Sequence, residues 1–167
     1  MTTLNSLHEG FDAVADANTR VLVLGSLPGQ KSLTQRRYYA HPSNHLWRLL
    51  GPVIGTDLVA LDYDSRLAAL LRARVGLWDV LGSAERLGSL DMAIRNPNVR
   101  DLGAMIATLP NLRAVAFNGG TALRHGRRQF GAANGIPVIA LPSSSAAHTV
   151  GLAAKQVAWD QIRTYLE

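Results

Sequence analysis

Two segments of the chain combine residue types that suit the binding of a base or an anion. Gly25-Ser-Leu-Pro-Gly29 has two glycines that let a ligand approach the backbone amides. Because no Lys-Ser or Lys-Thr pair ends this segment, it is not a P-loop, and ATP use is disfavoured. Arg36–His45 interleaves aromatic rings with cations, which suits a stacked base and its neighbouring phosphates. Alternatively, its two tyrosines are core residues and Ser43 or Asn44 caps a helix.

Two further segments carry polar side chains after apolar runs. Asn118 precedes two glycines, and its carboxamide offers a donor and an acceptor to a base edge; a turn-forming Asn-Gly is the alternative. Leu141–His148 is rich in hydroxyl groups that could bind phosphates. In it, His148 could donate a hydrogen bond or stabilise negative charge. A Ser-His triad is disfavoured because the chain has no Gly-x-Ser-x-Gly elbow.

The hydrophobic pattern predicts an alternation of strands and helices. We expect strands at 20–25, 75–81, 113–118 and 136–141, because these apolar runs are short and rich in β-forming residues. We expect helices over about 4–17, from 43 or 44 to about 55, after 64, over about 100–109, from 121 and from about 152. This order predicts a single domain over residues 1–167, a three-layer α/β/α sandwich with a central, mostly parallel four-stranded sheet.

In such sheets, ligands bind at the carboxyl ends of the strands. The segments expected there are Ser26–Gly29, Gly82–Asn98, Gly119-Gly120 and Pro142–His148. Each is rich in Gly, Pro, Ser or Asn, as ordinary turns are, but together they outline one site. Asp79 also ends a strand beside them, although a strand-end aspartate that caps a loop is the alternative reading.

The composition narrows the class of protein. Seventeen Lys and Arg against 12 acidic residues give a net charge of +5, which is consistent with attraction to phosphates. Fifteen of these cations are Arg, which suits bidentate phosphate contacts or reflects a composition bias. The absence of cysteine excludes disulfides, Cys-ligated zinc and iron–sulfur clusters, so we expect no metal and no cofactor. Without a membrane-length apolar run or a signal-peptide core, we expect a soluble cytoplasmic protein.

These segments, in this order, resemble the uracil-DNA glycosylase superfamily, and most closely its hypoxanthine-DNA (deoxyinosine) glycosylase branch. The most specific part is Gly25–Gly29 followed by Tyr-Tyr-Ala-His-Pro-x-Asn-x-x-Trp at 38–47. Gly-Leu-Trp-Asp-Val at 76–80, Gly-Ser-Leu-Asp-x-Ala-Ile at 88–94 and Phe-Asn-Gly at 117–119 reinforce it. The resemblance covers nearly the whole chain. It implies a monofunctional DNA glycosylase that hydrolyses the N-glycosidic bond of a flipped deaminated base, hypoxanthine or uracil, in base-excision repair.

The resemblance also implies roles for individual residues. The implied base pocket consists of Gly25, Ser26, Leu27, Pro28 and Gly29, with Tyr39 stacking on the base and Asn118 reading its edge. Ser143, Ser144, Ser145 and His148 are implied to contact DNA or to stabilise the leaving base. Asn44 matches the Asn of the branch's His-Pro-x-Asn motif and is the implied principal catalytic residue.

The chain departs from the superfamily in its first loop. Many relatives carry Asp or Asn two residues after the first Gly, where this chain has Leu27, which cannot orient a water. The Asn44 carbonyl oxygen can hold that water, and weak activation suffices if the transition state is dissociative, because stabilising the leaving base then dominates. Since neither Lys31 nor Lys155 matches a Schiff-base role, we expect no lyase activity.

Several alternatives stay open. Ala146 and Ala147 stand where larger apolar residues often fill the gap left by a flipped base, so mispaired lesions, which are cheaper to unstack, would be preferred. Asp91 and Arg95 are structural residues or DNA contacts. With Leu27 in its first loop, the chain is alternatively a catalytically weak or idle DNA-damage binding module. An α/β hydrolase is a remote alternative, which predicts no salt-dependent DNA binding. A monomer is the natural state for an enzyme that scans DNA.

Overall fold

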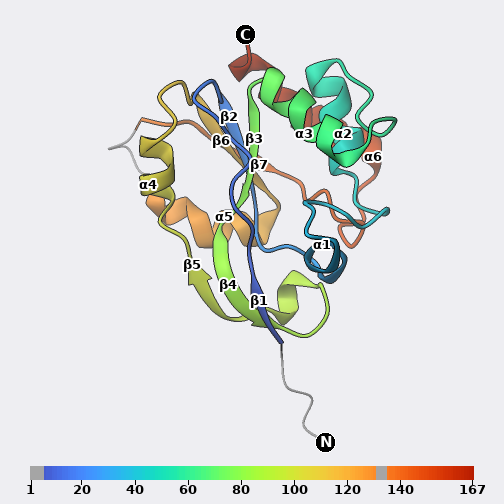
Figure 1. Cartoon of the computed structure of the whole chain (residues 1–167), viewed down its shortest axis with the longest axis vertical. Coiled ribbons are helices and arrows are strands. Elements are labelled where there is room, and N and C mark those ends of the chain that lie inside the picture. The colour runs from blue at the N-terminus through green and yellow to red at the C-terminus, as the bar shows by residue number, and fades with distance from the viewer. Residues whose placement is uncertain (1–5, 131–134) are drawn as a thin grey trace, which may run out of the picture.

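The computed structural model describes residues 6–130 and 135–167 as two sheets with helices packed around them (Figure 1). The central sheet contains β2 (Val21–Gly25), β3 (Val75–Asp79), β6 (Ala114–Asn118) and β7 (Val138–Leu141). Its order is β3-β2-β6-β7 and every pair is parallel, which confirms the predicted sheet. The register places Gly25 beside Asp79 and Asn118 beside Leu141. The carboxyl ends of all four strands therefore share one edge.

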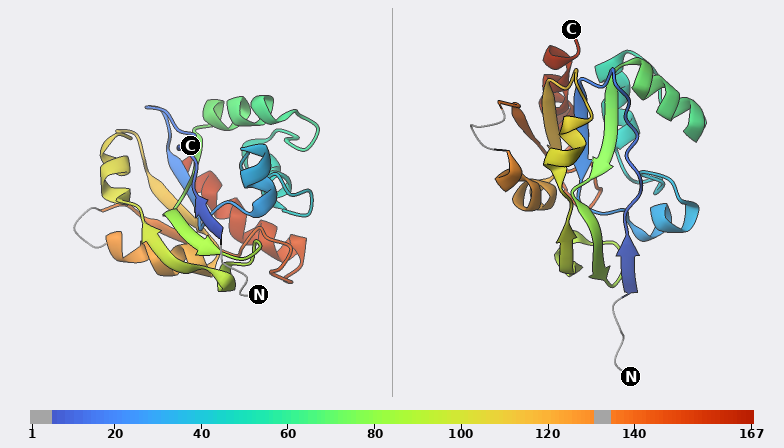
Figure 2. Two further views of the ribbon diagram at one scale, coloured as in Figure 1. Left: turned by 60° about the horizontal axis from the view of Figure 1, so that its bottom comes forward. Right: turned by 60° about the vertical axis from the view of Figure 1, so that its left-hand side comes forward.

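Helices cover both faces of the central sheet, as Figures 1 and 2 show. One face carries α2 (Leu46–Ile54), α3 (Tyr63–Arg72) and α6 (Leu152–Trp159), and the other carries α4 (Leu102–Ala107) and α5 (Gly120–Gly126). Residues of β2 alternate between the two cores, because Val21 and Val23 pack with the first group while Leu22 and Leu24 pack with the second. This arrangement confirms the predicted three-layer sandwich.

A second, antiparallel sheet of three strands lies below the central one in Figure 1, and the sequence did not predict it. Its order is β1-β4-β5, formed by β1 (Ser6–Glu9), β4 (Leu81–Arg86) and β5 (Arg95–Val99), with a 3-10 helix η1 (Asp91–Ala93) between the last two. The expected strand over 75–81 forms as β3 but ends at Asp79. The expected loop over 82–98 is wrong, because it contains most of β4 and β5. The chain passes from one sheet to the other at Val80, whose amide donates to the Gly25 carbonyl oxygen at 2.8 Å.

The helix predicted over 4–17 is also wrong for the described residues, which begin at 6; Leu4 and Asn5 lie outside them. Ser6–Glu9 pairs with β4, and the Gly10 amide donates to the Gly82 carbonyl oxygen at 2.8 Å. Val14 and Leu77 exchange two backbone hydrogen bonds of 2.9 Å. Because these backbone groups pair with distant strands, they are not available for the i to i−4 bonds of a helix.

The remaining predicted helices form with shifted ends. α2 begins at Leu46, whose amide donates to the Asn44 Oδ1 at 3.0 Å, and ends before Gly55 at a φ of 72°. The sequence did not predict α1 (Gln30–Gln35) or the 3-10 helices η2 (Arg127–Gln129) and η3 (Asp160–Tyr165). Among the described residues, none of the helices has the length and apolar character needed to cross a membrane.

Candidate active site

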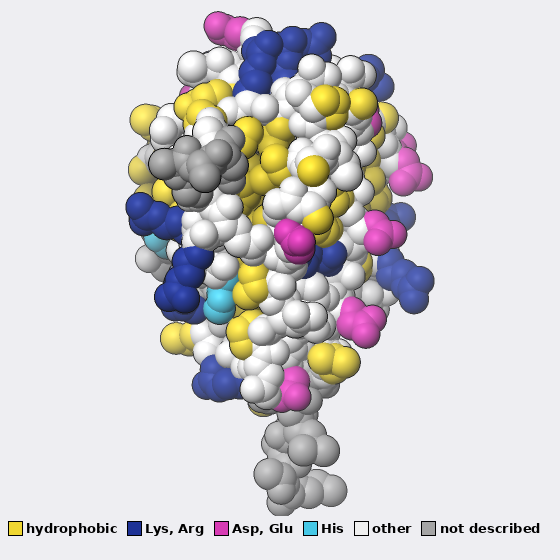
Figure 3. All heavy atoms as spheres, turned by 90° about the vertical axis from the view of Figure 1, so that its left-hand side faces the viewer, with side chains coloured by type: hydrophobic (Ala, Val, Ile, Leu, Met, Phe, Trp, Pro, Cys, Tyr) yellow, Lys and Arg dark blue, Asp and Glu magenta, His cyan; other side chains and the backbone are white. Residues whose placement is uncertain are grey.

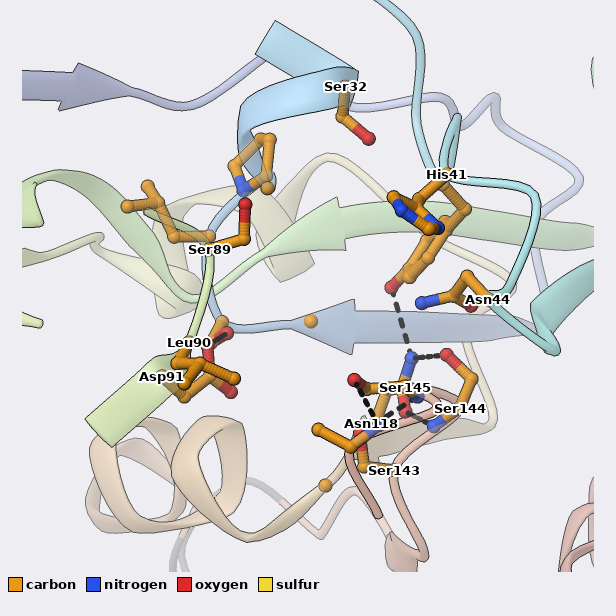
Figure 4. Close-up of a pocket in the computed structure, with 18 of the residues that line it drawn as sticks. Ser32, His41, Asn44, Ser89, Leu90, Asp91, Asn118, Ser143, Ser144 and Ser145 are labelled. Carbon is orange, nitrogen blue, oxygen red and sulfur yellow. Dashed lines mark hydrogen bonds between the residues drawn. The ribbon is translucent and has the colours of Figure 1, made fainter. Parts of the chain in front are cut away.

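A cavity of about 540 Å³ opens at the carboxyl ends of the central strands (Figure 4). All the predicted site residues line it, namely Gly25, Ser26, Leu27, Pro28, Gly29, Tyr39, Asn44, Asn118, Ser143, Ser144, Ser145 and His148. Asp79 and the segment Ser89–Met92 also line it. The structure therefore brings together segments that lie more than a hundred residues apart in the sequence.

The Asn118 side chain joins three walls of the cavity. Its Oδ1 accepts from the Ser144 amide at 2.8 Å, while its Nδ2 donates to the Ser144 Oγ at 2.9 Å and to the Tyr39 hydroxyl at 3.2 Å (Figure 4). Both amide hydrogens are thus engaged by the protein. The prediction that Asn118 reads a base edge stays a prediction, and it would require these bonds to be shared or exchanged.

Tyr39 is held in place from several directions. Its φ of 52° lies in the left-handed region, and its carbonyl oxygen accepts from the Trp47 indole nitrogen at 3.1 Å. The two rings meet edge to face at 6.4 Å. Burial, reinforced by the nearby Asp79 carboxyl, raises the pKa of the Tyr39 phenol, so its hydroxyl stays protonated. Tyr39 therefore presents a fixed, neutral ring; stacking on a base stays a prediction.

The loop after β2 is fixed by the second sheet. The Ser26 hydroxyl donates to the Asp91 Oδ1 at 2.7 Å, and the Gln30 amide donates to the Ser89 Oγ at 2.8 Å. Arg86, which is 1% exposed, donates from Nη2 to the Pro28 carbonyl oxygen and has its Nη1 3.7 Å from the Asp91 Oδ1. A buried arginine, a serine and an aspartate thus shape the first loop.

Asp91, which the sequence allows as a structural residue or a DNA contact, belongs to this support. The role of Arg86 is not predictable from the sequence, where it is only a cation within a polar stretch. Arg95 points elsewhere, because its Nη1 donates to the carbonyl oxygens of Met92 and Ile94. Leu27, which is 7% exposed, packs into the apolar core. The first loop therefore offers its backbone and the Ser26 hydroxyl to the cavity.

Asn44 lies on the wall opposite Ser89 and Asp91, with its side chain directed into the cavity (Figure 4). Its Oδ1 accepts from the Leu46 amide at the start of α2. The N-cap residue of this helix is His45, so the alternative that Ser43 or Asn44 is the N-cap is wrong. No described residue accepts from its amide nitrogen. An amide oxygen has two lone pairs, so the bond to Leu46 leaves one of them for a water. This hydrogen bond and the predicted catalytic role of Asn44 are therefore compatible.

The serine-rich loop after β7 is held by hydrogen bonds within the loop and by hydrogen bonds from His45 and Lys155. The Ser145 amide donates to the Ser143 Oγ at 3.1 Å, and the Ser144 carbonyl oxygen accepts from the His45 amide at 2.9 Å. The fully buried Lys155 donates from Nζ to the Ser145 carbonyl oxygen at 3.0 Å, and burial lowers its pKa. Lys155 is thus occupied beneath the loop, whereas Lys31 lies on the wall of the cavity.

Asp79 is the most perturbed acid in the cavity wall. It is 3% exposed, and no described residue donates a hydrogen bond to its Oδ2. Burial, helped by the nearby Asp91, raises the pKa of this carboxyl to about 7 against the opposing effects of Arg100 and Arg86. Asp79 is therefore poised between its neutral and ionised forms near neutral pH. Over residues 6–130 and 135–167 there is no group of three or more His, Asp or Glu that could hold a metal ion.

Comparisons with known proteins agree on one family. The family model described as Uracil DNA glycosylase superfamily matches residues 11–163. The chain is 39% identical over 151 residues to a hypoxanthine DNA glycosylase of Methanosarcina barkeri, covering 90% of this chain and 94% of the relative. It is 36% identical over 156 residues to a hypoxanthine DNA glycosylase of Methanosarcina acetivorans, covering 93% of this chain and 98% of the relative.

A solved structure has the same fold. The solution NMR structure of a candidate uracil DNA glycosylase from Methanosarcina acetivorans superposes with a TM-score of 0.86. The two chains are 35% identical, and the match covers 96% of this chain and 99% of the other. Fold and sequence thus point in the same direction over almost the full length.

The burial of Asp79 predicts a pH-dependent stability. In the unfolded chain this carboxyl ionises near pH 4, but in the folded protein only near pH 7, so wild-type stability falls as the pH rises between these values. Asp79→Asn removes this ionisation. The free energy of unfolding of the variant, relative to wild type, should rise by on the order of 2–3 kcal/mol from pH 5 to pH 8. Thermal and denaturant unfolding at both pH values measure it; an unchanged difference would show that Asp79 ionises normally.

Proposed function

Because this chain belongs to the uracil DNA glycosylase superfamily, we propose that it removes hypoxanthine or uracil from DNA by hydrolysing the N-glycosidic bond. Membership makes the chain a DNA glycosylase that acts on deaminated bases. Two relatives named hypoxanthine DNA glycosylases support hypoxanthine as the first choice of base. The observation that carries the proposal is the cavity at the strand ends, where Asn44, Tyr39 and the backbone of Gly25–Gly29 converge.

The cavity suits a flipped nucleotide. Its volume of about 540 Å³ falls within the roughly 300–1,000 Å³ typical of ligand sites. The neutral ring of Tyr39 offers a stacking surface, and the backbone amides of Ser26, Leu27 and Gly29 offer donors to the polar edge of the base. A base inside a duplex cannot reach such a cavity, so the target nucleotide must leave the stack.

Asn44 acts as the principal catalytic residue in this proposal. Its carbonyl oxygen positions a water for attack on C1′ of the deoxyribose, while the hydrogen bond from the Leu46 amide keeps the side chain oriented. Asn is a weak base, so bond breaking must lead and the leaving base must carry negative charge. Donors around that base, among them the first-loop amides and His148 on the cavity wall, stabilise this charge.

Contacts with the rest of the DNA come from the rim of the cavity and from basic side chains. Ser143, Ser144 and Ser145 present hydroxyl and amide groups at the opening. A second groove adjoins it, lined by Gly120, Leu123, Arg124, Arg127, Arg128 and Phe130. Figure 3 shows Lys and Arg side chains along one edge of the face that contains α4 and α5. The net charge of +5 supports attraction to phosphates.

The finer assignments belong to the same proposal. The chain acts as one domain and as a monomer in the cytoplasm, without a metal ion, and it lacks lyase activity. Ala146 and Ala147 line the cavity, and alanines are poor wedges for filling the gap left by a flipped base. Mispaired or single-stranded lesions, which cost less to unstack, are therefore preferred over well-paired ones.

A panel of oligonucleotides tests the activity. Strands with one deoxyinosine or one deoxyuridine, single-stranded and paired, should acquire abasic sites that alkali cleaves, whereas an undamaged strand should stay intact. Cleavage without alkali would contradict the absence of lyase activity. If no lesion yields an abasic site while lesion DNA is still bound, the chain is an idle damage-binding module, the alternative suggested by Leu27.

Substitutions of Asn44 test its role. Asn44→Ala should lower single-turnover excision by about 10²-fold or more, because the water loses its acceptor, while DNA affinity stays nearly unchanged. It should also cost about 1 kcal/mol of stability through the lost hydrogen bond with the Leu46 amide. Asn44→Asp keeps an acceptor for both the Leu46 amide and the water and serves as the matched control, with much of the activity retained. An equal loss of DNA binding in Asn44→Ala would instead make Asn44 a DNA contact or a purely structural cap.

A further inference from the structure

The carboxyl group of Asp79 is an unpaired polar group in the wall of the cavity. The side chain is 3% exposed and lines the space where the proposed function places the base. No described residue donates to its Oδ2. Leaving a buried polar atom without a partner costs free energy, so such atoms are rare in folded proteins and call for an explanation.

The local packing directs this carboxyl toward the base-binding loop. Gly25 lies beside Asp79 in the neighbouring strand. A Cβ atom at Gly25 would lie 2.6 Å from the Asp79 Oδ1 and 2.8 Å from the Tyr39 hydroxyl. Only glycine therefore allows the carboxyl and the phenol to approach the start of the first loop together. The site is built to bring Asp79 close to whatever that loop holds.

Neighbouring side chains at the strand ends already have partners. The Asn118 amide group donates hydrogen bonds to Ser144 and to Tyr39. The Ser26 hydroxyl donates a hydrogen bond to Asp91. At the ends of β2, β3 and β6, the Asp79 Oδ2 is the side-chain oxygen among the described residues that is both buried and unpartnered.

The charged groups around Asp79 leave its neutral form accessible. Burial and Asp91 raise the pKa of the carboxyl, Arg100 and Arg86 oppose the rise, and the resulting pKa is about 7. The phenols of Tyr38 and Tyr39 also face it, and their own pKa values are raised by burial and by Asp79. A neutral carboxyl group can donate a hydrogen bond, which a carboxylate cannot.

We propose that Asp79 contacts the flipped base and donates a hydrogen bond, as a neutral carboxylic acid, to the carbonyl oxygen that deamination places on that base. This inference rests on the proposed function. Replacement of an amino group by a carbonyl turns a donor into an acceptor, and the Asp79 hydroxyl pairs with that acceptor. Asp79 is thereby both a specificity-determining and a catalytic residue.

The reaction balances with Asp79 unchanged. The bond from C1′ to the base nitrogen breaks, and its electron pair moves onto the base. The water oxygen bonds to C1′ and releases one proton, which neutralises the departing base. Asp79 keeps its proton throughout and stabilises the charge that develops on the carbonyl oxygen. An ionised Asp79 would repel that charge, so excision must slow as the carboxyl ionises.

Single-turnover excision of hypoxanthine between pH 5 and pH 9 tests the inference with Asp79→Asn and Asp79→Leu. The wild-type rate should fall about tenfold per pH unit above the ionisation of Asp79. Asp79→Asn keeps an N–H donor without ionisation, so its rate should be lower at pH 6 but should lose the alkaline fall. Asp79→Leu removes the donor and should lower the rate by about 10²- to 10³-fold at pH 6.

The outcomes separate this inference from the proposed function. If the wild type excises neither hypoxanthine nor uracil, the proposed function fails. If the wild type excises but the alkaline fall persists in Asp79→Asn, the fall belongs to another group and the inference is overturned. Wild-type rates in Asp79→Leu would overturn it as well. Thermal unfolding of each variant at pH 6 shows whether a lost rate reflects lost folding.

Discussion

The Asn118 carboxamide donates two hydrogen bonds and accepts one, and these connect β6 to Ser144 in the last loop and to the Tyr39 hydroxyl. The shape of the cavity depends on them. They span 79 residues in one direction and 26 in the other. Because the bonds are buried or half-buried, water competes poorly for them, and losing one would leave polar groups unsatisfied. The parallel sheet holds Asn118 in position, because this residue ends a strand in which every residue is buried.

The second sheet supports the loop that follows β2. β4 carries Arg86, and the turn after it carries Ser89 and Asp91, so this sheet holds the first loop from the side opposite the serine loop. Leu27 of the first loop packs into the apolar core. In our proposals, the catalytic groups therefore come from elsewhere, from Asn44 before α2 and from Asp79 at the end of β3.

Much of this architecture could be predicted from the sequence, because short apolar runs such as 20–25 and 113–118 mark buried parallel strands. Their order places the predicted site residues at one edge. The second sheet could not be predicted from the hydrophobic pattern. All residues of β5 are exposed, and the first residue of β4, Leu81, follows the apolar run of β3 with only Val80 between them. The start of the chain was misread as helical, because Ser6–Glu9 pairs with a strand more than seventy residues away.

Individual roles were harder to predict than positions. The sequence indicated Asn118 and Asp79 only as polar residues after strands, and it favoured the amide as the reader of the base. In the structure the amide hydrogens are engaged, while the carboxyl is buried and unpaired. That contrast depends on Gly25 and Tyr39, which approach Asp79 across strands and loops, so no local pattern could reveal it.

In our proposal, the cavity at the strand ends receives a flipped deaminated nucleotide. NMR chemical-shift mapping of the Asn44→Ala protein with an oligonucleotide that contains one deoxyinosine tests this binding. We expect saturable shifts concentrated at Gly25–Gly29, Asp79 and Asn118, which an otherwise identical deoxyadenosine strand does not produce. Equal shifts with both strands, or shifts confined to surfaces remote from these residues, would contradict it.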